Sequence, residues 1–134
     1  FFGEKDLQQL CIIKKLVQKM NSPIVIVGMP TIREKNGLAK SSRNSLLSKK
    51  DRKTASIIYS CLIYCKENKS KGINYLRKYV TNKISDQERL ELEYLEFVCL
   101  EKMQRITHWK DKKKSAICIA LFIGGIRLID NIIL

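Results

Sequence analysis

Two short stretches of this 134-residue chain carry side chains suited to binding phosphate. Residues 40–43 (KSSR) follow a glycine-containing loop and offer two hydroxyls and a guanidinium, whose planar fork matches phosphate oxygens. Residues 3–9 (GEKDLQQ) read as a loop that opens a helix, where backbone N–H groups and the helix dipole favour an anion. Lys5 adds a mobile positive charge there. We expect Lys5, Gln9 and residues 41–43 to converge on one cleft that binds a phosphate-bearing ligand.

Each stretch also has a purely structural interpretation. Asp6 could cap the helix while Gln9, three residues later, closes a capping box, and from this stretch alone the cap is the favoured interpretation. Ser41 and Ser42 could instead make local turns. The chain has no GxxxxGK, so neither stretch is a Walker A motif.

The first stretch needs elements that hold it in place. Apolar residues at three- and four-residue spacing predict a helix over residues 6–20. The β-branched run at 24–28 (IVIVG) predicts a strand buried on both faces of a parallel sheet. Helix followed by strand is half of a βαβ unit, so residues 1–3 are expected to end a preceding strand.

Helices are also expected in the middle of the chain. Ser48, with Asp51 three residues later, resembles a capping box and predicts a helix over residues 49–66. A second helix is predicted over residues 73–83, where Ile73, Leu76 and Val80 share one face.

The last third of the chain changes character. Alternating apolar residues predict a strand over 90–98, and residues 115–134 read as two strands joined at Gly124 and Gly125. The chain therefore reads as α/β: the end of a parallel domain over residues 1–31, then a small α+β domain over 32–134. A short antiparallel sheet covered by the two middle helices is expected in the second part.

The formal net charge of +13 favours an anionic partner. The tightest basic run, residues 110–114 (KDKKK), is predicted to be a solvated turn because no aromatic residues interleave with it as a nucleic-acid stacking platform requires. A basic nucleic-acid-binding module stays open as a less favoured alternative. The longest apolar run is too short to cross a bilayer.

Cysteine and histidine usage argues against a metal or nucleophile site. The chain has five cysteines, an odd number, and no CxxC motif, which indicates reduced thiols in a cytosolic compartment. His108 is the single histidine, so a zinc site has few possible ligands and a catalytic Cys-His or Ser-His pair has no signalled third member.

Three segments in this order and spacing make a more specific pattern: FFGEKDLQQL, then IVIVGMPTIREKNGLAKSSRNSLLSKKDRKTA, then GGIRLIDN. Together they resemble the pantoate–β-alanine ligase (pantothenate synthetase) family over nearly the whole chain. The resemblance implies a ligase that uses ATP and Mg²⁺ to adenylate pantoate, then lets β-alanine attack the adenylate to form pantothenate for coenzyme A biosynthesis. It also implies a cytoplasmic homodimer with no nucleic-acid or membrane partner.

The resemblance further implies a Rossmann-like nucleotide-binding domain ending at residue 31 and a C-terminal lid over residues 32–134. Asp6 would lie near the ribose, Lys5 near the phosphates, and Gln9 would bind pantoate. Ile32 would meet adenine through its backbone. The implied ATP-binding residues are Gly3, Glu4, Lys5, Asp6, Ile32, Lys40, Ser41, Ser42 and Arg43; the implied catalytic residues are Lys5, Ser41, Ser42 and Arg43.

The chain departs from the family pattern at several points. Lys40 stands where the family usually has Leu or Met, Asn36 replaces the Asp of DGLA, and Cys99 replaces a common Asp. The family's HxGH-type ATP motif and its earlier pantoate-binding glutamine match nothing in these residues, and His108 does not fit that motif. We therefore expect a portion of the enzyme that is inactive alone. Another ligase of the same nucleotidyltransferase superfamily, with a different acid substrate, stays open.

Overall fold

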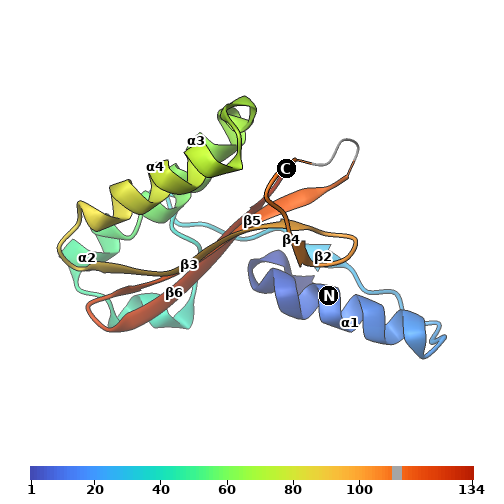
Figure 1. Ribbon diagram of the computed structural model, residues 1–134. Helices are drawn as coiled ribbons and strands as arrows, with labels where there is room; N and C mark the ends of the chain where they lie inside the picture. The colour runs from blue at the N-terminus through green and yellow to red at the C-terminus, as the bar shows by residue number, and fades with distance from the viewer. Residues whose placement is uncertain (110–112) are drawn as a thin grey trace.

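The chain folds around a four-stranded antiparallel sheet (Figure 1), and the computed structural model describes residues 1–109 and 113–134. The strands of this sheet are β3 (Leu90–Cys99), β4 (Gln104–Arg105), β5 (Ser115–Ile123) and β6 (Ile126–Ile133). The helices are α1 (Leu7–Lys19), α2 (Lys49–Thr54), α3 (Ile57–Glu67) and α4 (Ile73–Ser85), with 3-10 turns η1 (Glu4–Asp6), η2 (Ser42–Leu46) and η3 (Lys69–Lys71). Two further strands, β1 (Phe2–Gly3) and β2 (Gly28–Met29), form a separate parallel pair.

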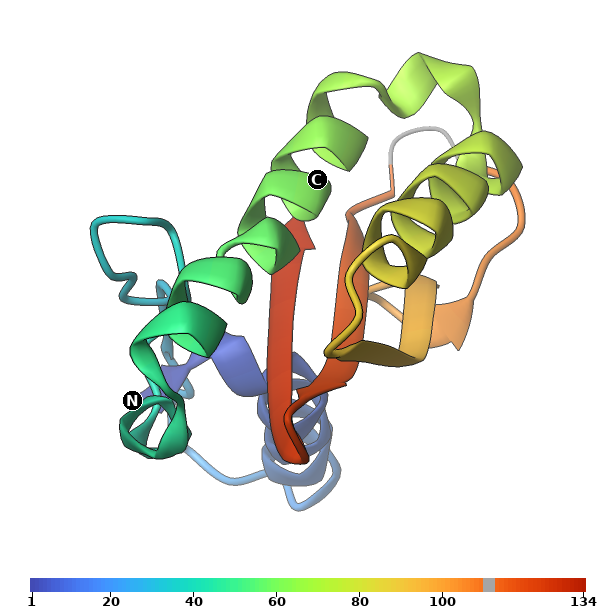
Figure 2. The ribbon, with the colours of Figure 1, turned by 90° about the vertical axis from the view of Figure 1, so that its left-hand side faces the viewer.

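The four-stranded sheet separates two layers. Its strands follow the order β4-β3-β5-β6, α3 and α4 cover one face (Figure 2), and α1 packs on the other. This arrangement confirms the predicted fold class and the antiparallel sheet covered by the middle helices. The boundary between residues 31 and 32 stays a prediction.

β5 lies between β3 and β6 in the sheet and is buried on both faces. Successive side chains of a strand point to opposite faces, so the continuous apolar run of β5 fills both layers. Under α3 and α4 it contributes Ile117, Ile119, Leu121 and Ile123. On the other face, Ala116 contacts Leu7 of α1 and Val98 of β3 in a second, smaller core.

The N-terminal segment confirms one expectation and corrects another. β1 pairs with β2 in parallel across α1, as the βαβ interpretation predicts. The strand predicted over residues 24–28 is wrong, because only its last residue belongs to β2. Ile24 and Val25 are 62% and 81% exposed. Within the described residues, the two-residue β1 is the only partner of β2, so no ladder extends along this β-branched run.

The helix predicted over residues 49–66 is interrupted. The hydroxyl of Ser48 accepts the N–H of Asp51 at 3.0 Å, as a cap requires. However, α2 ends at Thr54 and α3 starts only at Ile57. Between them, bonds spanning three residues (Ser56 N–H to Lys53, Ile58 N–H to Ala55) tighten the chain and place Ala55 in the core. The helix predicted over residues 73–83 is confirmed as α4.

Part of the basic run predicted as a solvated turn, residues 110–112, lies outside the described residues. No helix in the described parts of the chain is long and apolar enough to cross a membrane. All five cysteines are free thiols. Burial raises the pKa of Cys61 to about 11 and that of Cys65 to about 12, so both stay protonated and unreactive near neutral pH.

The predicted hairpin at Gly124 and Gly125 is confirmed: β5 pairs with β6 from Ile123–Ile126 outward. The two glycines have positive φ angles of 54° and 82°. A Cβ added at Gly124 would lie 2.6 Å from a guanidinium nitrogen of Arg89, whereas Gly125 has open space. Arg89 binds both carboxylate oxygens of Asp51 at 2.8 and 3.0 Å, so the hairpin tip is packed against the side chain that anchors α2.

We predict that Gly124→Ala lowers the free energy of unfolding by more than Gly125→Ala does. A left-handed backbone alone costs a side chain about 1–2 kcal/mol, and Gly124→Ala would also displace Arg89 from Asp51. Urea unfolding of both variants measures the difference. In an Arg89→Ala background the excess cost at Gly124 should disappear; equal losses in the native background would contradict the role of the Arg89 contact.

Candidate functional site

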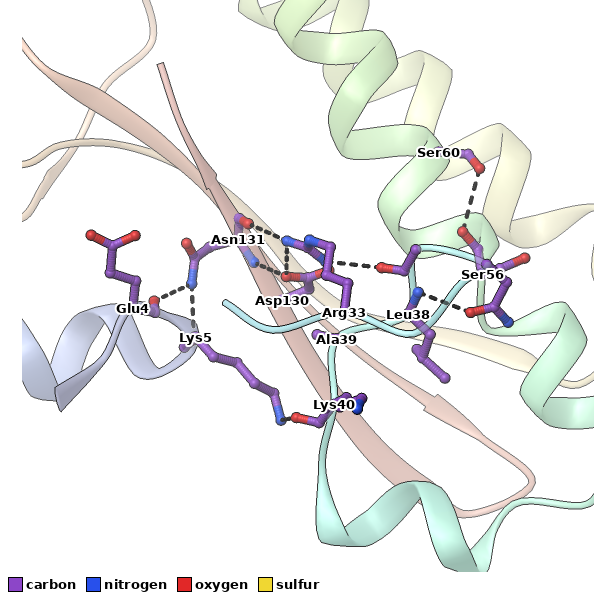
Figure 3. Close-up of polar contacts among 12 residues, drawn as sticks. Glu4, Lys5, Arg33, Leu38, Ala39, Lys40, Ser56, Ser60, Asp130 and Asn131 are labelled. Atoms are coloured by element: carbon purple, nitrogen blue, oxygen red, sulfur yellow. Dashed lines mark hydrogen bonds and ion pairs between the residues drawn. The ribbon is translucent and has the colours of Figure 1, made fainter. Parts of the chain in front are cut away.

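Three segments far apart in the sequence meet beside the second half of β6 (Figure 3). They are the turn η1, which carries Lys5, the loop of residues 33–40, and the neighbouring Asp130 and Asn131 of β6. The side-chain amide of Asn131 donates hydrogen bonds to the backbone carbonyls of Glu4 and Lys5 at 2.7 and 2.8 Å. The start of α1 is thereby fixed to the last strand of the sheet.

A buried ion pair fixes the 33–40 loop to the same strand. Arg33 donates to the two carboxylate oxygens of Asp130 at 2.6 and 3.0 Å, and the Asp130 side chain is only 2% exposed. Arg33 also donates to the carbonyls of Gly37 and Asn131, and its guanidinium lies 3.9 Å from the centre of the Tyr59 ring. A guanidinium with this many partners has its charge well compensated.

The loop itself is a narrow hairpin, with backbone bonds from Glu34 to Leu38 and from Lys40 to Ile32. The side-chain oxygen of Asn36 accepts the N–H of Leu38 at 3.1 Å, a local turn that an aspartate also makes. Gly37 has φ +88°, and an added Cβ would collide with the Tyr59 ring. The Asn36 departure from the family pattern is thus compatible with the loop.

Asn44 organises the KSSR turn that follows. Its amide is buried and donates to Glu34 at 2.8 Å and to the Ala39 carbonyl at 3.2 Å. Hydrogen bonds from Arg52 hold the pKa of Glu34 below its ordinary value, and Asn44 adds to this effect. The hydroxyl of Ser41 accepts the N–H of Arg43 at 3.2 Å. One predicted phosphate ligand therefore also caps its own turn, while Ser42 and Arg43 are exposed.

The two predicted phosphate stretches touch through Lys5. Its ammonium donates to the carbonyl of Lys40 at 3.4 Å. Burial lowers the pKa of Lys5, and the charge of Arg43 lowers it too, while Asp6 and Asp130 oppose the shift. A partly desolvated ammonium beside a guanidinium is electrostatically suited to an anion. The Lys40 contact uses its main chain, so the lysine in place of Leu or Met leaves this contact intact.

Gln9 lies on another side of Lys5. Both residues line a pocket of about 430 Å³ between the start of α1 and the sheet, together with Tyr94, Arg127 and Asn131 among others. Residues 41–43 are not among the described residues that line it. The structure thus brings Lys5 to both partners, but the single shared cleft expected for Lys5, Gln9 and residues 41–43 is not formed as one pocket.

The capping box expected at Asp6 is absent, because the Asp6 side chain makes no cap hydrogen bond in α1. That carboxylate is not committed to the helix end. Glu4 belongs to the same turn η1, and the space beside Gly3 is open to an added Cβ. Ile32 is exposed and its carbonyl accepts the N–H of Lys40. The ligand roles of these residues stay predictions.

Metal binding finds no support in the described residues, which contain no group of three or more His, Cys, Asp or Glu side chains arranged to hold an ion. Lys5 and Arg43 place positive charge at the meeting point, and the Asp130 carboxylate there is paired with Arg33. Mg²⁺ prefers carboxylate and water oxygens, so the residues present do not make a resident Mg²⁺ site.

Sequence reasoning missed four residues that position the site: Arg33, Asp130, Asn131 and Asn44. Asp130 and Asn131 belong to the GGIRLIDN segment that carries part of the family resemblance. The sequence did offer one signal for them: an acid and an amide lie side by side in a strand of the predicted apolar hairpin.

Comparison with known proteins agrees with these observations. The sequence profile of pantoate-beta-alanine ligase matches residues 1–133. The pantothenate synthetases of Azobacteroides pseudotrichonymphae and Cytophaga hutchinsonii are 44% and 37% identical, over 98% and 100% of this chain and 48% of each relative. The chain spans about half the length of the curated relatives it matches.

Solved structures agree with the fold. Pantothenate synthetase from Thermus thermophilus superimposes with a TM-score of 0.86 at 30% identity, over 98% of this chain and 48% of that one. Pantoate-beta-alanine ligase from Francisella tularensis, complexed with beta-gamma ATP and beta-alanine, superimposes with a TM-score of 0.64 at 30% identity, over 98% and 41%.

We predict that Asp130→Ala destabilises the fold by about 3–5 kcal/mol, because Arg33 would keep a poorly hydrated charge without its partner. Urea unfolding measures the loss, and Asp130→Ala combined with Arg33→Met should recover part of it. The control is Glu93→Ala, which breaks the Arg127–Glu93 pair, where both side chains are 37% exposed; there about 1 kcal/mol or less is expected. Similar losses at the two pairs would contradict the interpretation.

Proposed function

The chain belongs to the pantoate-beta-alanine ligase family, and from this premise we propose that it supplies half of the active site of an ATP-dependent enzyme that joins pantoate to β-alanine. The observation that carries the proposal is the contact of Lys5 with the Lys40 carbonyl. It joins two sequence stretches, each suited to phosphate, into one positively charged position. The printed description of the Francisella relative, with its ATP-type ligand and beta-alanine, supports the same substrates here.

The proposed reaction has two steps. A pantoate carboxylate oxygen attacks the α-phosphorus of ATP, the bond from that phosphorus to the bridging oxygen breaks, and pyrophosphate leaves. The amine of β-alanine then attacks the acyl carbon of the pantoyl adenylate. AMP leaves with the ester oxygen, and the attacking amine nitrogen loses one proton and keeps the other as the N–H of the new amide. Negative charge shifts toward the pyrophosphate in the first step, where preorganised positive groups lower the barrier.

Lys5 and Arg43 are assigned to this charge. Burial lowers the pKa of Lys5, so an arriving phosphate restores a partner to an ammonium that has lost part of its hydration. Arg43 is exposed on the η2 turn, where its guanidinium can reach a triphosphate without breaking a contact described above. Ser41 and Ser42 add hydroxyl donors. The exposed turn is the part best placed to close over ATP and exclude water from the adenylate.

The remaining residues are assigned to the nucleoside and to the acid. Gly3, Glu4 and Asp6 would line the nucleotide, with Asp6 at the ribose, because its carboxylate is not used as a helix cap. Ile32 would meet adenine through its backbone. Gln9 would bind pantoate, since it shares a pocket with Lys5.

Several finer properties belong to the proposal by family membership alone. They are the adenylate intermediate, the place in coenzyme A biosynthesis, a cytoplasmic location and a homodimeric enzyme. Mg²⁺ is proposed only as the companion ion of ATP, and no ligand in this chain is assigned to it. The test of the function is ATP–pyrophosphate exchange by the full-length protein. Exchange that needs pantoate supports the proposal, whereas exchange with another hydroxy acid only would assign a different substrate.

We predict that residues 1–134 alone make no pantothenate. They contain one of the two parts of the ATP site that the family pattern requires. Product formation by a sample whose intact mass matches these residues only would contradict this expectation; the full-length protein, assayed in parallel, is the positive control.

We predict that Arg43→Ala in the full-length protein slows adenylate formation about 100- to 1,000-fold, the usual effect of removing one preorganised donor of transition-state charge. Apparent pantoate affinity should change little. Gln9→Ala should instead weaken pantoate binding by about 1–3 kcal/mol, because a polar group buried in the complex would lose its partner, and leave ATP affinity near normal.

Single-turnover adenylation, titrated separately in ATP and pantoate, separates these two effects. Lys50→Ala and Gln18→Ala are the controls, since they remove the same kinds of group at exposed positions of α2 and α1. An unchanged adenylation rate in Arg43→Ala, or a loss confined to ATP binding in Gln9→Ala, would overturn the assignments.

A further inference from the structure

We propose that Asn131 is a positioning residue for Lys5, and that it holds the Lys5 ammonium at the distance at which it reaches the Lys40–Arg43 loop. The inference rests on the proposed function, because that function assigns Lys5 to the phosphates of ATP. The hydrogen bonds of Asn131 go to Arg33, Asp130 and the backbone of Glu4 and Lys5. Its effect is transmitted through the backbone of η1 (Figure 3).

The hydrogen bonds of Asn131 bracket Lys5. A carboxamide nitrogen carries two hydrogens, and here they go to the carbonyl before Lys5, on Glu4, and to the carbonyl of Lys5 itself, at 2.7 and 2.8 Å. Those two carbonyls flank the Cα from which the Lys5 side chain leaves. Fixing both peptide planes fixes the Cα–Cβ bond from which the side chain starts. A shift of either plane displaces the whole side chain, including the ammonium that lies 3.4 Å from the carbonyl oxygen of Lys40.

Asn131 is itself held on two sides, which makes it a rigid reference point. Its N–H donates to the Asp130 carboxylate at 2.8 Å, its carbonyl accepts from Arg33, and it pairs with Cys118 of β5. The residue is 6% exposed. Because Arg33 opens the loop that leads to Lys40, the same part of β6 sets the position of both phosphate stretches. The Lys5 side chain connects them.

A double-mutant cycle on the full-length protein tests this role. Asn131→Ala is expected to slow adenylate formation about 10- to 100-fold, the cost of misplacing a reacting group by about 1 Å. In a Lys5→Ala background the same substitution should add less than about threefold, because a residue that acts through Lys5 has nothing left to position. The affinity for ATP, measured by calorimetry, should follow the same pattern.

Asn68→Ala is the matched control. Its side-chain amide also donates to a backbone carbonyl, that of Tyr64 at 2.9 Å, but at the end of α3. It should leave adenylation unchanged in both backgrounds. Asn131→Leu keeps the approximate shape of the side chain, removes both donors and adds no charge, so it should reproduce the loss if Asn131→Ala proves too unstable to assay.

The outcomes separate the two hypotheses. Full additivity of Asn131→Ala and Lys5→Ala, in a wild-type protein that exchanges pyrophosphate with pantoate, overturns the positioning role and leaves the proposed function standing. So does an unchanged rate in Asn131→Leu. A wild-type protein that forms no adenylate refutes the proposed function, and the positioning role is then refuted with it. A loss of adenylation rate in Asn131→Ala that vanishes in the Lys5→Ala background supports both the proposed function and the positioning role.

Discussion

Burying an aspartate carboxylate is unfavourable unless a positive group pairs with it, and Asp130 pairs with Arg33. This ion pair connects the last strand of the sheet to the loop that carries the KSSR turn. It matters less for the fold topology, since the hairpin and the helices that cover it share a separate apolar core. It is needed because a polar loop has no apolar face of its own, so only specific charge and hydrogen-bond partners can fix its position relative to the sheet.

The two faces of the sheet serve different purposes. The face under α3 and α4 is apolar, and there Phe97 and Ile117 of the sheet pack in one core with Leu62 of α3. The other face carries a small apolar contact with α1, and a polar pocket opens beside it. Stability thus comes mainly from one layer, while the other can present charged groups. That separation lets the site keep a desolvated lysine without disturbing the main core.

Sequence patterns predicted what depends on local periodicity and missed what depends on distant partners. The helix at α1, the hairpin at Gly124 and the strand β3 follow from spacing and turn chemistry within a few residues. The strand expected over residues 24–28 is wrong because a strand exists only where another strand pairs with it. For the site, phosphate chemistry singled out Lys5 and residues 40–43 from side-chain type. Asn131 has no such signature, since its role exists only after folding brings Glu4 beside it.

The contact between Asn131 and Glu4 joins residues 127 positions apart, which has a consequence for the order of events during synthesis. A ribosome adds about 5–20 residues per second, so at least about 6 s separate the emergence of the two partners. α1 can form early from local contacts, but the turn that carries Lys5 gains its final geometry only after β6 has emerged and paired with β5. During synthesis there is therefore a period in which α1 is present while the backbone of the turn that carries Lys5 is not yet fixed. The binding geometry of Lys5 is established later than the helix that follows it.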